Sequence, residues 1–292
     1  MSRLHIRQRD KHAEIELEAF GCRSLGDLTA LKNKYAGPVF IVASGPSVKN
    51  FPIERYRAVP MMAVNGSIAC FPMGINPVFF LCDDSSVAAG KSDLVAEGVR
   101  RSEFSVMGPD ALESLAEKEA EAVWLSRMFV AERVNRWRGV ARLSDWRFAW
   151  QERNNPDYVI QRSLFSQKRS RVGFSRNFSA GYFSCRTIAY AAIQLACYLG
   201  FNQVFMVGMD LQASLGHFYD PKGMRIPSRL DEDYEDLILP HFKLMSSQVL
   251  GRDFQVFNLS PNSRLPSDVL PKIGFSELDG ILGLTEVEGL SI

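Results

Sequence analysis

The first stretch able to bind a ligand is PVFIVASGPSVKNF, residues 38–51, where an apolar run ends in small residues. Such a strand end can close its backbone around a phosphate, or it can simply turn a corner. The N–H groups of Ser44, Gly45 and Ser47, around Pro46, could hold phosphate oxygens. The stretch lacks the G-K-[ST] of a Walker A loop and the G-x-G-x-x-G of a dinucleotide loop. Alone, it favours a plain turn.

Two further strand ends carry polar residues. In AVNGSI, the Asn65 amide has a donor and an acceptor with which to read a base or a ribose, although Asn65, Gly66 and Ser67 could also form a simple turn. In LCDD, the carboxylates of Asp83 and Asp84 could bind a metal, a ribose or a sugar hydroxyl, or they could cap a helix.

A buried helix is predicted over residues 179–200, with Ser179 as its N-cap and Gly200 as its terminator. Its start, Ser179-Ala180-Gly181, would then present free N–H groups and the positive end of the helix dipole to an anion.

General-base chemistry needs a group that titrates near neutral pH, and four histidines are present. His217 lies in the loop GHFYDP, where Tyr219 could donate a hydrogen bond to a leaving phosphate. His241, at the start of a helix, competes for the role of base. His5 and His12 lie in a polar N-terminal stretch, where we expect solvated side chains.

Short apolar strands must position these residues. They are predicted at 38–44, 59–66, 77–84, 104–108, 202–211 and 254–260. Helical segments alternate with them, which is typical of an α/β fold with a mostly parallel sheet. We predict an N-terminal polar and helical extension (1–36), two parts of the α/β domain (37–126 and 178–275), an insert between them (127–177) and a C-terminal tail (276–292).

The predicted insert is strongly basic. Residues 127–176 hold twelve Arg and Lys against four Asp and Glu, a net charge of +8, interleaved with three Trp. This composition indicates either a lid that binds an acidic acceptor or a solvated basic face.

Composition excludes several classes of protein. The 292 residues carry a net charge of +1, so the whole chain is no obvious nucleic-acid binder. Neither a signal peptide nor an apolar run long enough to span a membrane is expected. The five cysteines lie mostly in apolar segments, which indicates reduced core residues. The sequence has no cluster of His and Cys residues of the kind that binds zinc, so no zinc site is expected.

Read in order, five motifs resemble one family. They are FIVASGPSVKNF, AVNGSIACF, VFFLCDD, FSAGYFSCRTIAYAAIQLACYLGFNQVFMVGMDL and NLSPNSRL. Their order is similar to that of bacterial sialyltransferases that use CMP-sialic acid, and of the wider group sharing their G-P-S loop. The first two motifs look closer to transferases that add a further Kdo, a 3-deoxy-ulosonic acid, from CMP-Kdo to the lipopolysaccharide inner core.

The resemblance implies roles for matched positions. Ser44, Gly45 and Ser47 would line the CMP phosphate and ribose, Asn65 would contact the nucleotide, and Asp83 would contact the sugar. The other implied donor-site positions are Pro46, Gly66, Ser67, Asp84, Ser179, Ala180, Gly181, Asp210, Pro261, Asn262 and Ser263.

The family's catalytic histidine has no counterpart at the matching distance from the P-N-S turn, since His241 lies slightly late and His217 well early. Ser44 and Ala180 also replace the family's usual Asn and Ser. We assign the general base to His217, because its loop carries Tyr219 and follows a site-forming strand. His241 remains the alternative.

The resemblance implies one GT-A-like, Rossmann-type domain that moves Kdo from CMP-Kdo to a lipid A-core acceptor by direct displacement. No cofactor would be required, with Mg²⁺ at most stimulatory. Arg169, Arg171 and Arg176 would bind acceptor anions. The enzyme would be cytoplasmic, peripheral at the inner membrane of a Gram-negative bacterium.

Three alternatives stay open. The donor could be CMP-sialic acid, because sialic acid and Kdo share the features that CMP-dependent transferases read. A pterin pyrophosphokinase-like protein of the MptE type would instead bind ATP and Mg²⁺ through Asp83 and Asp84. A non-enzymatic protein would only bind an anionic membrane surface. The acceptor linkage and any homo-oligomer are also left open.

Overall fold

A computed structural model describes residues 4–8, 13–163, 168–212, 214, 216, 218 and 230–284. Its centre is a seven-stranded sheet of order β12-β11-β4-β5-β6-β7-β8, with every neighbouring pair parallel. The strands are β4 (Pro38–Val42), β5 (Met61–Val64), β6 (Phe79–Cys82), β7 (Phe104–Met107), β8 (Met128–Val130), β11 (Gln203–Val207) and β12 (Gln255–Asn258). The prediction of an α/β fold with a parallel sheet is confirmed.

The edge strand β8 was missed by the sequence analysis. The run from Ala111 to Trp137 has the composition of one long helix, but helix α3 (Pro109–Leu125) ends at Leu125. Met128, Phe129 and Val130 then pair with β7, and this pairing overrides their helical neighbourhood. The range predicted as the insert therefore begins with a strand of the central sheet.

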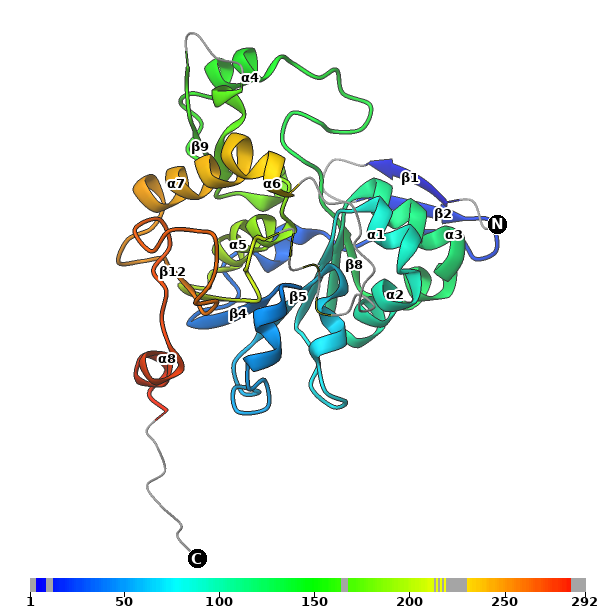
Figure 1. The fold of residues 1–292 in the computed structure, drawn as a ribbon. Coiled ribbons are helices and arrows are strands. Elements are labelled where there is room, and N and C mark those ends of the chain that lie inside the picture. The colour runs from blue at the N-terminus through cyan, green and yellow to red at the C-terminus, as the bar shows by residue number, and fades with distance from the viewer. Residues whose placement is uncertain are drawn as a thin grey trace, which may run out of the picture.

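Two hydrophobic layers cover the sheet, because alternate residues of each strand face opposite sides. Val39 and Ile41 of β4 face α5 (Ile188–Leu199) and α7 (Leu239–Gln248). Phe40 and Val42 face the other layer. That layer includes α1 (Ser85–Gly90), α2 (Ser92–Arg101), α3 and α8 (Phe275–Leu282). Figure 1 shows α1, α2 and α3 grouped on one side of the sheet and α5 and α7 on the other.

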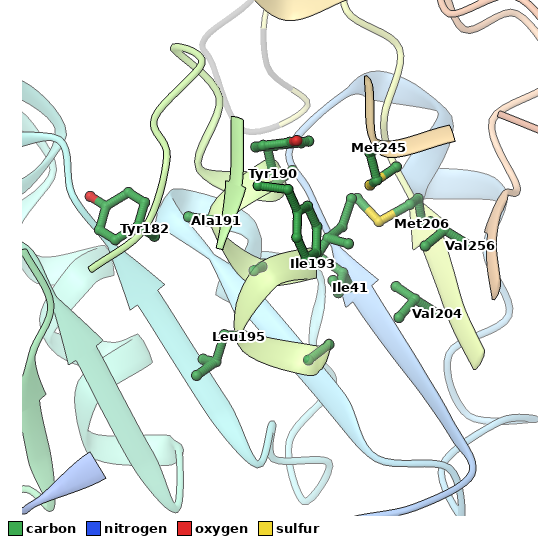
Figure 2. Close-up of a cluster of buried hydrophobic side chains, with 14 of the residues drawn as sticks. Ile41, Tyr182, Tyr190, Ala191, Ile193, Leu195, Val204, Met206, Met245 and Val256 are labelled. Atoms are coloured by element: carbon green, nitrogen blue, oxygen red, sulfur yellow. The ribbon is translucent and has the colours of Figure 1, made fainter. Parts of the chain in front are cut away.

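Helix α5 is apolar on nearly every side because it is buried between the sheet and α7. In Figure 2, Tyr190 and Ile193 of α5 lie beside Ile41 of β4 and Met206 of β11. The helix ends at Gly200, whose positive φ of 103° is a left-handed C-cap. The prediction of a buried helix that ends at Gly200 is confirmed.

Residues 4–8 and 13–24 form a sheet, and the helical pattern expected at the end of this extension is present as a short 3₁₀ helix, Leu28–Leu31. β1 (Leu4–Gln8), β2 (Ala13–Leu17) and β3 (Gly21–Ser24) pair antiparallel in that order. In β2, Ala13, Ile15 and Leu17 are buried and alternate with glutamates, a period-2 pattern typical of a half-buried strand.

Beyond β8, the basic residues 131–176 form a small unit at one end of the molecule, which we call the basic unit. It holds α4 (Asp145–Gln151) and the antiparallel pair β9 (Tyr158–Ile160) and β10 (Gly173–Ser175). Figure 1 places α4 and β9 at the opposite end from α8, with the short α6 (Leu230–Asp233) near α7.

The direction of winding reverses beside β4. From β4 the chain proceeds outward through β5, β6, β7 and β8, and after the basic unit it returns to place β11 and β12 on the other side of β4. The loops after β4 and β11 therefore diverge at the carboxyl ends of neighbouring strands. In open α/β sheets this switch point is where ligands bind.

Candidate functional site

A cavity of about 220 Å³ opens at this switch point, and we call it the switch cavity. The ends of β4, β5 and β11 line it together with the start of α5. Its predicted lining residues are Ser44, Gly45, Pro46, Asn65, Asp84 and Asp210. Residues far apart in the sequence thus meet at one site, as the sequence analysis expected.

The loop after β4 lies directly against the end of β11. The Gly45 N–H donates to the Gly208 carbonyl at 2.9 Å, and the Ser47 N–H donates to Asp210 Oδ2 at 2.9 Å. A Cβ at Gly45 would clash with both acceptor residues, so a close approach requires glycine here. Two of the N–H groups expected to hold a phosphate are therefore engaged within the protein.

Hydrogen bonds from residues 260–263, around the late P-N-S turn, hold the loops after β4 and β11 in place. The hydroxyl of Ser47 donates to that of Ser260 at 2.9 Å, and Ser260 Oγ accepts from the Met209 N–H at 2.8 Å. Ser263 is buried and donates to the Met209 carbonyl. Asn262 contributes its carbonyl oxygen, which accepts from Gln212, and Pro261 is exposed. In this structure the turn positions the switch cavity rather than lining it.

Asn65 combines two unusual features. It adopts a positive φ of 49°, and its buried Oδ1 has no hydrogen-bond partner among the described residues. The neighbouring Gly66 and Ser67 are buried, and Ser67 Oγ accepts from the Val64 N–H at 2.8 Å. A strained backbone and an unsatisfied acceptor at a cavity are typical of a ligand site.

A second cavity, of about 320 Å³, adjoins the first and shares Asn65 and Asp84 with it. We call it the Asp83 cavity. Asp83 accepts from Arg133 Nε at 2.7 Å and from the Tyr182 hydroxyl. Burial raises the pKa of Asp83, although Arg133 opposes the shift, and burial together with Asp83 raises the pKa of Tyr182 well above its ordinary value.

Asp84 serves as a helix cap as well as a cavity residue. Its Oδ1 accepts from the N–H groups of Ser86 at 2.9 Å and Val87 at 3.2 Å, at the start of α1. The sequence analysis offered a ligand site or a helix cap for these two carboxylates. In the structure Asp83 faces a cavity and Asp84 caps a helix.

The predicted start of the buried helix is wrong. Helix α5 begins at Ile188, with Thr187 as N-cap. Residues 181–183 instead extend beside 132–134, with Tyr182 N–H donating to the Glu132 carbonyl at 3.1 Å. Ser179, Ala180 and Gly181 form a 3₁₀ turn and its cap and line none of the described cavities. The helix N-terminus at the switch cavity belongs to Thr187, Ile188 and Ala189.

The structure describes only one of the two candidate bases, His217 and His241. His217 and Tyr219 lie outside the described residues, but Gly216 of the same loop lines the switch cavity. His241 is fully buried, and its Nδ1 hydrogen-bonds to the Leu237 carbonyl at 2.7 Å. Burial lowers the pKa of His241 to about 4, and it lines no described cavity. These features do not support a role in proton transfer to substrate.

Arg186 is a site residue that the sequence analysis missed. It directly precedes the N-cap of α5, has a positive φ of 69°, and lines the switch cavity and the Asp83 cavity. An arginine beside the cap residue of the most apolar helix is the sequence signal that could have identified it.

Arg186 also reaches a third cavity, of about 130 Å³, lined by four arginines, which we call the arginine cavity. The arginines are Arg133, Arg136, Arg171 and Arg186. Of the three predicted acceptor residues, Arg171 lies here. Arg169 lines a separate groove beside α7, and Arg176 is exposed near the Gln248 carbonyl.

Within the described ranges, no three Asp, Glu, His or Cys side chains are grouped so as to hold a metal ion. In the same ranges, no helix has both the length and the apolar character needed to cross a bilayer.

The chain is an α/β protein with a crevice at the switch point of its parallel sheet, beside a helix N-terminus and an arginine, and in open α/β sheets such crevices are where ligands bind. The chain belongs to the WaaZ family of 3-deoxy-D-manno-octulosonic acid (Kdo) transferases, whose model matches residues 24–276. It is thus a glycosyltransferase, and the resemblance to Kdo transferases is confirmed.

Two curated relatives are each described as a probable 3-deoxy-manno-octulosonic acid transferase. The Escherichia coli K12 protein is 30% identical over 85% of this chain and 86% of its own length. The Salmonella typhimurium LT2 protein is 30% identical over 86% of this chain and 92% of its own. Among solved structures, the Campylobacter jejuni sialyltransferase CstII, in complex with CMP-3FNeuAc, matches 77% of this chain and 81% of that chain, with 12% identity and a TM-score of 0.34.

Proposed function

We propose that the chain transfers Kdo from CMP-Kdo to a lipid A-core acceptor of the lipopolysaccharide inner core, with the donor bound in the switch cavity. One observation carries the proposal: the cavity brings Asn65 Oδ1, which has no partner among the described residues, together with the N-terminus of α5 and with Arg186. An amide suits a cytosine or ribose edge, and the other two groups suit a phosphate.

The donor carries two anionic groups, the phosphodiester of CMP and the carboxylate of Kdo. Free N–H groups in the first turn of α5 would stabilise one of them together with the helix dipole. Arg186 would bind a carboxylate or phosphate through paired N–H donors. This role replaces the one that the sequence analysis gave to Ser179, Ala180 and Gly181.

Transfer would be a direct displacement. An acceptor hydroxyl oxygen forms a bond to the anomeric carbon of Kdo while the bond from that carbon to the phosphate oxygen breaks, and the electron pair leaves with CMP. His217 would take the hydroxyl proton, and Tyr219 would donate a hydrogen bond to the departing phosphate. His217 is preferred to His241, because His241 is buried away from every described cavity.

Asp83 would orient the transferred sugar. Its Oδ2 accepts hydrogen bonds from Arg133 Nε at 2.7 Å and from the Tyr182 hydroxyl, which hold the carboxylate in place. A carboxylate held this rigidly can accept hydrogen bonds from sugar hydroxyls in one defined geometry.

Membership of the Kdo transferase family argues against the sialic acid donor and the pyrophosphokinase alternative. Because this family consists of enzymes, it also argues against a non-enzymatic protein that only binds an anionic membrane surface. A GT-A-like description of the domain remains part of this proposal.

The proposal is tested by a thermal-shift panel of CMP, CDP, ATP and NAD, followed by CMP-Kdo turnover on a Kdo-bearing lipid A acceptor. CMP should raise the melting temperature, because it binds the folded state. Asn65→Gly removes the side chain without straining the positive φ, so it should fold normally and lose about tenfold or more in kcat/KM. ATP binding without CMP binding would contradict the proposal.

A further inference from the structure

The arginine cavity has no assigned ligand, yet it is continuous with the proposed reaction site. Four residues line both this cavity and the Asp83 cavity. They are Arg133, Tyr182, Ser184 and Arg186. The Asp83 cavity in turn adjoins the switch cavity through Asn65 and Arg186. A molecule seated in the arginine cavity could therefore present a neighbouring group to the donor sugar.

The positive charges around this cavity are incompletely balanced. Among the described residues, its lining holds four guanidinium groups and one carboxylate, that of Asp145. Arg171 pairs with Asp145 at 2.9 Å, and Arg142, just outside the cavity, shares the same carboxylate at 3.1 Å. Arg133 is held by Asp83.

Two arginines are left to attract an anion. Among the described residues, Arg186 forms one ion pair, with Asp233 at 3.7 Å, and more than half of its side chain is exposed. Within the described part of the chain, the Arg136 guanidinium makes no hydrogen bond or ion pair. Partial burial lowers the pKa of Arg136, the charges of Arg142 and Arg133 lower it further, and Asp145 opposes the shift.

We infer that the arginine cavity binds an anionic group of the acceptor, a carboxylate or a phosphate, while the attacking hydroxyl of that acceptor enters the Asp83 cavity. This inference rests on the proposed transferase function. A guanidinium presents parallel N–H donors that match either anion. Phe148 and Phe183 form apolar walls, which leave the guanidinium groups as the main polar feature of the pocket.

Arg136→Gln provides the test, because this side chain is exposed and has no described partner whose loss would unfold the protein. The acceptor is a water-soluble, delipidated Kdo-bearing core, and the matched control is Arg252→Gln, an exposed arginine that lines no described cavity. Arg136→Gln should raise the KM for acceptor about tenfold or more and leave the KM for CMP-Kdo and CMP binding within about twofold. The control should change neither.

Two modified acceptors identify the anion. One carries the acceptor carboxylate as a methyl ester, and the other lacks its phosphates. With the group that Arg136 binds removed, the wild-type KM should rise and Arg136→Gln should add no further loss, because the two changes delete the same interaction.

An unchanged acceptor KM in Arg136→Gln, or a full additional loss with both modified acceptors, would overturn the anion site while the transferase function stands. A wild-type protein that neither binds CMP nor turns over CMP-Kdo would overturn the proposed function and this inference together.

Discussion

Gly45 shows how one residue type sets the geometry of the site. The family resemblance implied that the G-P-S loop lines the CMP phosphate, whereas in the structure the N–H groups of Gly45 and Ser47 donate to Gly208 and Asp210. The loop thus shapes the cavity wall through its backbone, and the first residues of α5 line the same cavity. Local sequence patterns could not decide which backbone donors are engaged within the protein, because that depends on pairing between distant segments.

Burial of His241 should make the free energy of unfolding depend on pH. The His241 pKa of about 4 in the folded protein lies below the ordinary value of about 6.5 in the unfolded chain, so the unfolded state binds a proton first as the pH falls. The free energy of unfolding should therefore drop by about 3 kcal/mol between pH 6.5 and pH 4 on account of this group. Denaturant titrations across that range should show the slope, and His241→Leu should lose it.

The same variant separates structure from catalysis. His241→Leu should keep the pH dependence of turnover, while His217→Ala should lose most activity with a normal melting temperature. An inactive, folded His241→Leu together with an active His217→Ala would assign the base to His241.

At the scale of elements, α5 connects the core to the site through one buried polar side chain. Gln194 is fully buried, and its Oε1 accepts from the N–H groups of Ser175 and Phe183 at 2.9 and 3.0 Å. Its Nε2 donates to the carbonyls of Phe183 and Tyr190. This one amide fixes the end of β10 and the segment next to Tyr182.

Gln194→Leu should therefore destabilise both the fold and the site. It would leave buried backbone groups unpaired, each costing about 1–3 kcal/mol, so we expect a loss on the order of 3 kcal/mol or more in the free energy of unfolding. Chemical denaturation measures this loss, and exposed Gln151→Leu on α4 is the control, with no change beyond about 0.5 kcal/mol. A Gln194→Leu variant as stable as the wild type would contradict the role of this amide.

For the molecule as a whole, local patterns predicted most of the central sheet, since apolar runs and strand-end polar residues mark β4, β5, β6, β7, β11 and β12. The sequence predictions failed where pairing between distant segments sets the local structure. Ser179 has the residue type of an N-cap, but residues 181–183 extend beside 132–134, and α5 begins only at Ile188. The arginine cavity was invisible for the same reason, because Arg136, Arg171 and Arg186 meet only in the folded chain.

Charge is distributed unevenly over the molecule, and this asymmetry predicts that one end of it binds anionic membranes. The chain has a net charge of +1 although residues 127–176 alone carry +8, so the remainder is acidic. The basic unit lies at one end of the fold, where Trp146 and Val140 are exposed. Arg and Trp together suit an anionic membrane surface, and each surface cation contributes about 1 kcal/mol.

Binding to vesicles that contain phosphatidylglycerol should accordingly weaken about a hundredfold in the triple variant Arg147→Gln, Arg153→Gln, Arg162→Gln. Cosedimentation measures it, and raising the salt concentration should weaken wild-type binding because the Debye length shortens. Neutralising Lys49, Arg57 and Arg252, exposed cations outside the basic unit, removes the same charge and is the control. Equal losses in both triple variants would mean that net charge, rather than the basic end of the molecule, drives membrane association.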